Sequence, residues 1–335
     1  MNLVSKIKKE WFIVGMLCAI ALATVSENIG KTDGIIHLDQ LTGIGVAIVF
    51  FLHGLGLSPQ AIRAGISNWR LHIFIQSATF VAYPALWLLL GKGFTAVLPM
   101  ALALGFCYLF VLPSTISSSV AMTSVGKGNV PGAIFNASLS SILGVFLTPL
   151  LIQLFMGFEG LQLDLAQSVM SIGKLLLLPM VAGQLLRPLL VAYVERHKSV
   201  VNKIDKYVII LIVYNAFCDS VAQHIWSDFS LPLLLLCIAA CCVVLLIMVH
   251  IIQWSARKVG FARPDEVAAV FCGTKKTLAA GVPMAKVIFG ADPNLGMILL
   301  PIMLYHPLQI FYCAMLANRY AAQHNAANTA ISSEA

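Results

Sequence analysis

Ten apolar runs of roughly the length that crosses a bilayer core divide this chain. They lie near residues 11–30, 38–57, 69–90, 96–125, 130–155, 167–189, 205–224, 230–254, 264–288 and 294–318. Hydrophobic residues make up 59% of the 335 residues and charged residues only 10%, which is too little polar surface to cover a water-soluble globule of this size. We therefore predict an all-α polytopic membrane protein with ten transmembrane helices.

The basic residues predict the orientation of these helices. Most of the 21 Lys and Arg fall in loops on one side of the predicted membrane, whereas the opposite side holds only Lys31 and Lys92. By the positive-inside rule we expect both termini to be cytoplasmic, in a plasma membrane that would be the inner membrane of a bacterium. The net charge of +7 then reflects topology, so we expect no nucleic-acid partner. The partners that we expect are the lipid bilayer and a small organic anion, and we expect the protein to be a monomer or homodimer.

Weak internal symmetry suggests that the two halves of the chain are related. The segments LGVFLTP in the fifth run and LGMILLP in the tenth share a Leu-Gly pair and a proline at the same spacing. Because these runs are five apart and five is odd, a duplicated unit would enter the membrane from the opposite side. We expect inverted five-helix repeats over 1–160 and 161–320, followed by a disordered cytoplasmic tail over 321–335.

Two of the runs carry helix breakers near their middle. In the fourth run, Pro113 precedes residues 114–119, of which five have hydroxyl side chains; in the ninth run, the breakers are Gly273 and Pro283. A proline removes a helical hydrogen bond and frees a carbonyl, which is tolerated at this depth only where the backbone is buried in protein or lines a watery cavity. We therefore predict two broken helices whose ends form a ligand site, since half-helix N-termini attract anions and free carbonyls attract cations.

The ninth run also contains the adjacent cations Lys275 and Lys276. A charge at mid-bilayer costs about 2.5–3.5 kcal/mol on insertion scales, so a lysine at this depth usually marks a site. The acidic residues other than Asp219 belong to loops, tails or the ends of runs, and Asp219 itself lies toward the outer end of its run. The ammonium groups must therefore pair with carbonyls and hydroxyls, bind an anionic substrate, or lose a proton. On a helix, adjacent side chains point about 100° apart, so we expect one lysine to face a cavity and the other a packed interface, where it could be a structural pin.

Several ungapped motifs resemble the bile acid:sodium symporter family. They are FLHGLGLSP after the second run, GKGNVPGAIFNAS after the Pro113 break, and FCGTKKTLAAGVPMAKVIFG in the ninth run. The chain is most similar to an orphan branch of bacterial and vertebrate members with a lysine in the ninth span. The resemblance implies a core domain of spans three to five and eight to ten, with crossed broken helices, that moves against a panel domain of the other four spans.

The sodium ligands implied by this resemblance carry over only in part. The family's acid in the ninth span is replaced by Phe271, and two amides are replaced by Lys275 and Lys276. At an effective dielectric constant of 20, two unit charges 4 Å apart repel by about 4 kcal/mol, so a lysine there disfavours sodium. We expect degenerate sodium positions at Ser118, Ser119, Asn136, Ser140, Thr79 and Phe271, with Gln76 one turn before Thr79.

Together these features favour an alternating-access carrier of a small or amphipathic organic anion, with a lysine in place of the family's sodium ions. Two alternatives stay open: a sodium-coupled symporter, and a membrane regulator or scaffold that binds its ligand without moving it. We expect no enzyme activity, no metal site and no cofactor beyond a coupling sodium ion or proton, because no nucleophile–base set or metal-ligand spacing occurs near the midplane. Lys276 is our first choice for the cation that takes the place of sodium, and Lys275 is the second. The candidate substrate-binding residues are Lys276, Lys275, Ser117, Ser118, Ser119, Thr274, Thr277, Asn136 and His306.

Overall fold

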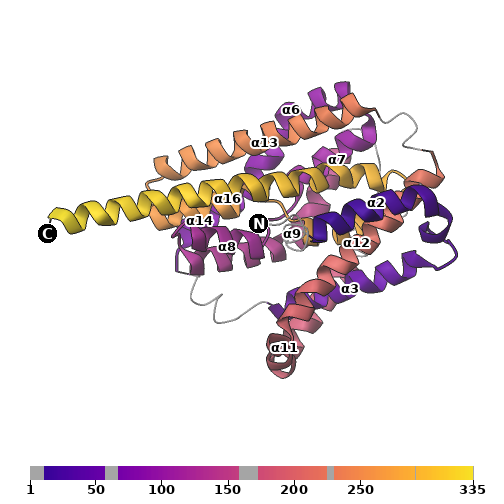
Figure 1. Ribbon diagram of the computed structural model, residues 1–335, viewed down its shortest axis with the longest axis horizontal. Helices are drawn as coiled ribbons and strands as arrows, with labels where there is room; N and C mark the ends of the chain where they lie inside the picture. The colour runs from indigo at the N-terminus through magenta and orange to yellow at the C-terminus, as the bar shows by residue number, and fades with distance from the viewer. Residues whose placement is uncertain (1–10, 57–66, 158–172, 225–229, 291, 335) are drawn as a thin grey trace, which may run out of the picture.

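The computed structural model describes residues 11–56, 67–157, 173–224, 230–290 and 292–334, and within them it is helical with no strand (Figure 1). The expected basic residues at positions 6, 8, 9 and 63, and the expected boundary between residues 160 and 161, lie outside the described residues. In chain order the helices are α2 (Trp11–Gly30), α3 (Leu38–Gly56), α5 (Trp69–Ser77), the π-helical turn η1 (Ala78–Ala82), α6 (Tyr83–Val97), α7 (Met100–Val111), α8 (Ser117–Val125), α9 (Val130–Gly157), the π-helical turn η2 (Gly173–Leu177), α11 (Leu178–Arg196), α12 (Lys198–Ala222), α13 (Leu231–Lys258), α14 (Arg263–Thr274), α15 (Leu278–Phe289) and α16 (Leu295–Glu334).

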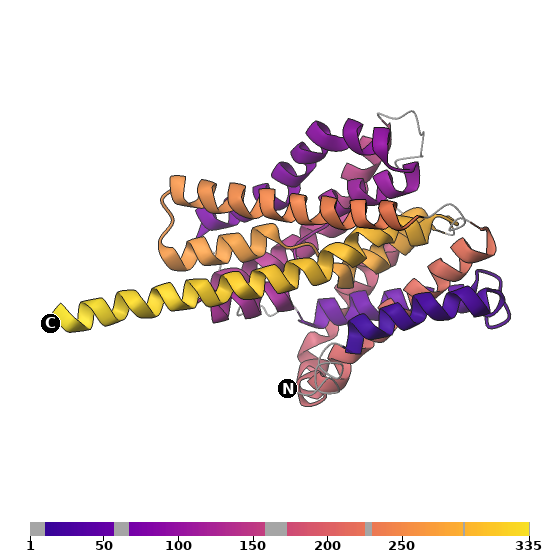
Figure 2. The ribbon, with the colours of Figure 1, turned by 45° about the horizontal axis from the view of Figure 1, so that its top comes forward.

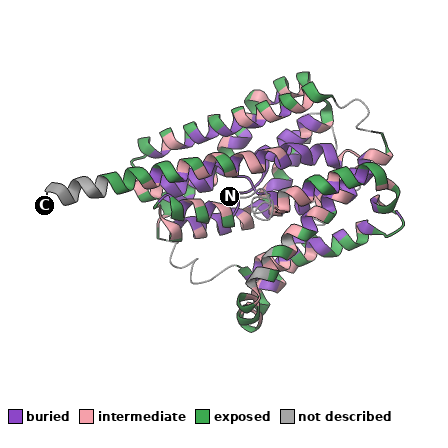
Figure 3. Cartoon of the chain, in the orientation of Figure 1, coloured by how far each residue is buried: buried purple, intermediate pink, exposed green. Residues whose placement is uncertain are grey.

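Helix length and side-chain exposure are those of a polytopic membrane protein. In the described part of the chain, six helical stretches are long and apolar enough to cross a membrane, namely Leu38–Gly56, Trp69–Val97, Val130–Phe155, Lys174–Arg196, Leu231–Lys258 and Leu295–Ala326. Exposed residues line the outer sides of the helices (Figure 3), and they include large apolar residues such as Leu89 and Leu189, which are 78% and 77% exposed. Apolar surface of this extent is expected to face lipid rather than water.

Four of the ten runs that we assigned from sequence do not meet the length and hydropathy of a spanning helix. The fourth and ninth runs are each divided into two short helices, α7 and α8, and α14 and α15, as their helix breakers predicted. The first run has a shorter apolar helix, Val14–Gly30, and α12 has a polar beginning with Lys203 and Lys206. The criterion of length and hydropathy therefore selects six of the ten runs, and the four that it leaves out are short, divided or partly polar.

The helices form two groups that meet along one side (Figures 1 and 2). In the panel group, α2 packs against α12 and α3 packs against α11. The core group contains α5 to α9 and α13 to α16, with α7 against α16 and α13 against α14. Extensive contact between the groups is made by α3 and α12 on α15, by α12 on α16, and by η2 on α9.

Two glycines let α3 and α11 approach each other at backbone contact distance. A Cβ atom on Gly54 would overlap the Met180 carbonyl oxygen, and one on Gly183 would overlap the Phe51 carbonyl oxygen. We expect Gly183→Ala to lower the free energy of unfolding by about 1–3 kcal/mol, because the two helices must move apart. Thermal unfolding in detergent measures this loss. Gly43→Ala on α3 is the matched control, since its Cβ would meet open space; equal losses in both variants would contradict the packing argument.

The segment that we expected to be a disordered tail continues α16 as helix to Glu334 and projects beyond the other helices (Figures 1 and 2). Five of the ten residues from 321 to 330 are alanine, the residue with the highest helix propensity, and the segment contains no Gly or Pro. Low hydrophobicity alone was therefore a poor guide to the backbone here.

Candidate functional site

Two helix interruptions meet in the core group. Residues 112–116 between α7 and α8, and residues 275–277 between α14 and α15, are not helical. Pro113 lies in the first interruption and packs on α9 at Gly144, where an added Cβ would come within 2.6 Å of the Pro113 side chain. The glycine therefore leaves room for the bend after α7.

Hydrogen bonds between the two interruptions satisfy backbone groups that a continuous helix would have paired internally. The Thr277 amide donates to the Pro113 carbonyl at 3.0 Å, and the Ser114 hydroxyl donates to the Cys272 carbonyl at 2.6 Å. The Ser114 amide donates to the Ser140 hydroxyl at 2.9 Å. The crossing is thus held by both segments of the chain and by Ser140 of α9, which explains how irregular backbone is accommodated in an apolar interior.

Lys276 is enclosed at this crossing and has no exposed surface. Its ammonium donates to the carbonyl oxygens of Thr79 at 3.1 Å, Phe110 at 3.0 Å and Leu112 at 2.7 Å. It also lies 4.0 Å from the centre of the Tyr83 ring, a favourable cation–π position. Because a lysine has three N–H donors, no donor is left for another ligand.

The local structure of α5, η1 and α6 explains why the Thr79 carbonyl is available. The Tyr83 amide bonds the Ala78 carbonyl, one residue further back than in an α-helix, and the next residue, Pro84, has no amide hydrogen. The Thr79 carbonyl is therefore bypassed by its own helix and turns to Lys276. A π-helical turn followed by a proline builds one wall of the cation's surroundings.

Gln309 of α16 fixes the peptide group of Lys276. The Lys276 amide donates to Gln309 Oε1 at 2.8 Å, and Gln309 Nε2 donates to the Lys276 carbonyl at 2.7 Å. Gln309 also shares a 3.1 Å hydrogen bond with the half-buried His306, so His306 contacts the crossing through this amide. We did not select Gln309 from the sequence, although an amide three residues after a histidine in an apolar run is a usable signal.

Lys275 has a different environment. Its side chain is also enclosed, but the ammonium makes a single described hydrogen bond, to the Ser118 carbonyl at 2.8 Å, and lies 5.9 Å from the Phe271 ring centre. Ser118 is half-buried and Ser117 is exposed, so this ammonium lies beside the surface at the start of α8. The environments of the two lysines therefore differ, as we expected. The reason is not the 100° spacing of adjacent helical residues, because both lysines lie in the non-helical segment.

The remaining hydroxyls of the ninth run are engaged locally. The Thr274 hydroxyl donates to the Val270 carbonyl at 2.6 Å, and the Thr277 hydroxyl caps α15 by accepting from the Ala280 amide at 3.2 Å. The Thr274 carbonyl accepts hydrogen bonds from the Tyr83 and Tyr305 hydroxyls, at 2.6 and 3.2 Å. This tyrosine pair anchors the end of α14, and sequence reasoning missed it because its members are far apart in the chain.

The positions that we expected to be degenerate sodium sites fall in two places. Asn136 is buried in a cluster with Gln76 and His72, in which Gln76 Nε2 donates to Asn136 Oδ1 at 3.2 Å and Asn136 Nδ2 shares a 2.9 Å hydrogen bond with His72 Nδ1. Gln76, and not Thr79, is thus the residue of this region that reaches Asn136; the Thr79 hydroxyl donates to its own helix at Ile75.

Ser119, Ser140 and Phe271 contribute to the crossing itself. The Ser119 hydroxyl donates to the Phe271 carbonyl at 3.0 Å, and Ser140 holds the Ser114 amide. Of the three expected break residues, only Pro113 lies in an interruption. Gly273 lies inside α14 and Pro283 inside α15, so the expectation was wrong in detail: the second interruption is the Lys-Lys-Thr segment between them.

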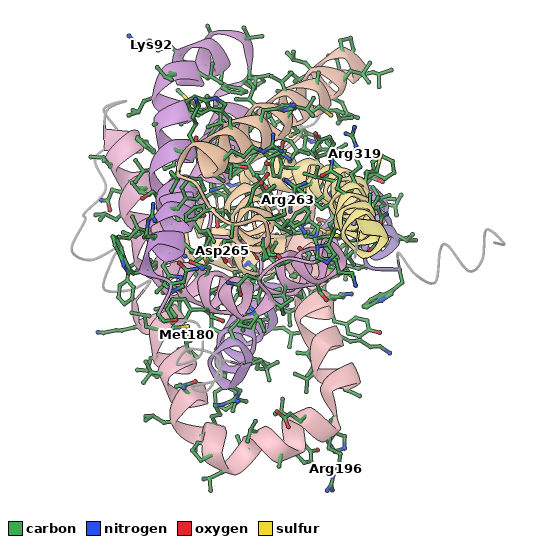
Figure 4. The ribbon with its side chains drawn as sticks, turned by 90° about the vertical axis from the view of Figure 1, so that its left-hand side faces the viewer. Lys92, Met180, Arg196, Arg263, Asp265 and Arg319 are labelled. Carbon is green, nitrogen blue, oxygen red and sulfur yellow. The ribbon has the colours of Figure 1, made fainter. Side chains whose placement is uncertain are left out.

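Acidic residues of α14 lie at its start, away from the lysines in sequence. Glu266 forms 2.9 Å ion pairs with Arg257 and Arg263. Asp265 accepts hydrogen bonds from the amides of Asn68 at 2.8 Å and Asn129 at 2.7 Å, at the end of the molecule shown in Figure 4. These carboxylates tie α14 to α13, α5 and α9, and both are engaged in those contacts.

In the part of the chain that the structure describes, one grouping of metal-ligand type occurs, outside the crossing. Asp33, His37 and Asp39, after α2 and at the start of α3, place one ligand atom each within 4.8 Å of the others, and Asp33 and His37 are exposed. We expected no metal site from the sequence and did not select these residues. Exposed groupings of this kind are common without an ion.

Comparison with known proteins identifies the family. The model of the SBF-like CPA transporter family matches residues 10–322. The chain is 43% identical to the uncharacterized protein PA2026 of Pseudomonas aeruginosa, over 96% of this chain and 95% of that protein. It is 39% identical to the putative symporter YfeH of Escherichia coli, over 93% of each, and 32% identical to sodium/bile acid cotransporter 7 of Mus musculus, over 94% of each. These matches confirm the resemblance inferred from the motifs: the chain belongs to the SBF-like CPA transporter family and is a multi-pass membrane transporter rather than an enzyme.

Proposed function

We propose that this protein carries a small or amphipathic organic anion by alternating access, and that the Lys276 ammonium takes the place of a bound sodium ion. The observation that carries the proposal is the set of three main-chain carbonyls around Lys276 at the crossing of the two interruptions. Carbonyl oxygens freed from helices are the ligands that transporters of this kind use for a coupling cation. Here a cation supplied by the polypeptide occupies them.

The two lysines then have separate roles. Lys276 uses all three donors internally, so it stabilises the crossing without binding substrate. Lys275 has donors beyond its Ser118 contact and lies beside the exposed Ser117, so it is the group that attracts the anion. Lys276 thus keeps the role of built-in cation, for which it was our first choice from sequence, and the attraction of the anion is assigned to Lys275. A buried lysine that loses its proton during the cycle would also provide proton coupling.

The proposal includes the membrane arrangement expected from the sequence: ten spans in two inverted repeats, over 1–160 and 161–320, with both termini cytoplasmic. Its support is the pair of interruptions, five runs apart, which exchange hydrogen bonds in both directions: Thr277 to Pro113 and Ser114 to Cys272. In this arrangement the core group moves relative to the panel group around the crossing.

A sodium-coupled symporter is the second candidate. Gln76 Oε1 is buried and has no hydrogen-bond partner among the described residues, beside Asn136 Oδ1, so this cluster offers an unused oxygen ligand. The relatives named sodium/bile acid cotransporter 7 favour the same alternative. The lysines that this chain has at the crossing argue against the sodium-coupled symporter, because they would repel a sodium ion bound nearby.

Sodium dependence separates the two candidates. The purified protein is first screened by thermal shift against organic anions, and the most stabilising anion is used for uptake into proteoliposomes. We expect equal uptake with sodium or potassium outside, and equal melting temperatures in sodium chloride and choline chloride. Uptake that requires an inward sodium gradient, or wild-type protein stabilised by sodium, would instead support the symporter. A ligand that binds but shows no counterflow would support the regulator or scaffold.

A further inference from the structure

The core and panel groups are hydrogen-bonded to each other at one end of the molecule. Lys286 of α15 donates to Asn215 Oδ1 of α12 at 2.8 Å. Nearby, the Ser220 hydroxyl of α12 donates to the Pro293 carbonyl, in the connection between α15 and α16, at 2.6 Å. Both bonds therefore join the last turns of α12 to the segment around the end of α15.

The charges on the two sides of this contact are complementary. Lys286 is half-buried, and its ammonium interacts electrostatically with Asp219 of α12 and Asp39 of α3, both on the panel group. Asp39 Oδ1 is buried and has no hydrogen-bond partner among the described residues. The flexible lysine side chain of the core thus bonds one amide of the panel, and its charge is opposite to that of two panel carboxylates.

Further hydrogen bonds hold the panel side of the contact together. Asn215 Nδ2 donates to the Gly30 carbonyl of α2 at 2.8 Å. Asp219 accepts from the amide and the hydroxyl of Thr32, at 2.6 and 2.8 Å. The partners of Lys286 are therefore tied to α2 as well as to α12, so a movement at Lys286 separates the groups as bodies rather than distorting α12.

In the described part of the chain, the panel helices contact the core mainly on α15 and α16, whereas the short helices α8 and α14 pack mainly on other core helices. The end of the molecule that contains Lys286 is thus the end at which α15 is held to the panel.

We propose that Lys286, Asn215 and Ser220 form a latch that keeps this end closed, and that Lys286 is a positioning residue of the transport cycle. The inference rests on the proposed alternating access, in which the two groups must separate at this end in one half of the cycle. Separation breaks the Lys286–Asn215 and Ser220–Pro293 bonds, while the attraction of Asp39 and Asp219 for the ammonium limits how far the groups move apart.

Spin-label distances test the latch without a substrate. Nitroxides are placed at Ala96, at the end of α6 in the core, and at Gln223, just after α12 in the panel; both residues are exposed. Attachment through an encoded keto amino acid avoids the eight native cysteines. In lipid nanodiscs, the wild type is expected to give mainly one short distance. For Lys286→Met we expect the ratio of long to short distances to rise roughly tenfold, the effect of losing one charge-assisted hydrogen bond.

The controls distinguish a latch from a general structural role. Lys286→Arg keeps a cationic donor and is expected to restore the wild-type distribution, and Lys174→Met replaces an exposed lysine of η2 and should change nothing. Ser220→Ala tests the second bond and replaces Lys286→Met if that variant does not fold. Unchanged distances in both Lys286→Met and Ser220→Ala would overturn the latch. Sodium-dependent uptake by the wild type would overturn the proposed function alone, because the distance measurement does not depend on it.

Discussion

Replacement of Lys276 by methionine is expected to lower the free energy of unfolding by about 3–5 kcal/mol. The methionine has a similar length but no donor, so the carbonyls of Thr79, Phe110 and Leu112 lose a partner inside the protein. Each buried carbonyl left unpaired costs about 1–3 kcal/mol, partly offset because the cost of burying the ammonium disappears. Thermal unfolding in detergent should show a midpoint lower by roughly 5–10 °C.

A second variant at the same position tests whether the site is a cation site. Lys276→Ala removes the side chain and leaves the three carbonyls around an empty space, which a small cation could occupy. We expect sodium chloride to raise the unfolding midpoint of Lys276→Ala in a concentration-dependent way, as binding to the folded state requires, while choline chloride does not. The wild type should respond to neither salt.

Lys275→Ala is the matched control for this rescue. It removes an ammonium of the same segment that has only one described carbonyl contact, so sodium should not restore its stability. If Lys276→Ala is as stable as the wild type in sodium-free buffer, or if sodium stabilises Lys275→Ala equally, the role of Lys276 as an internal cation is wrong.

The helix interruptions could be predicted from sequence because their chemistry is costly in an apolar run. Pro113 with its following hydroxyls, and the Lys275-Lys276 pair, cannot be accommodated in a lipid-facing helix, and the structure places both in the crossing. The position of the second break was less well predicted, since Pro283 is tolerated inside α15. A proline removes one helical bond but does not by itself end a helix.

The surroundings of the lysines could not be predicted, because they depend on contacts between distant segments. Gln309 and Tyr305 come from α16, and Tyr83 comes from the third run. The carbonyl of Thr79 is free only because η1 is π-helical, a local irregularity with no clear signal except Pro84. For the same reason the sequence alone did not separate the roles of Lys275 and Lys276.

Transport should depend most strongly on Lys275. We expect Lys275→Met to reduce uptake of the anion into proteoliposomes by a factor of about 100 or more, because one charge pair 4 Å apart at an effective dielectric constant of 20 is worth about 4 kcal/mol. Its unfolding midpoint should fall by less than that of Lys276→Met, since its ammonium has a single described carbonyl partner, Ser118. Lys275→Met is therefore expected to affect uptake more than stability, whereas Lys276→Met gives the larger loss of stability.

Two controls make this comparison specific for charge at the crossing. Lys275→Arg keeps a cation and is expected to retain part of the uptake, although the broader guanidinium must fit beside Ser118 and Phe271. Lys174→Met should leave uptake unchanged, because that side chain is exposed on η2. Full uptake by a correctly folded Lys275→Met would show that the anion is not attracted by this ammonium.

Counterflow of labelled anion in the wild type tests whether the protein is a carrier at all. If counterflow is absent, the protein binds its ligand without carrying it, since a carrier exchanges substrate across the membrane even without a driving gradient.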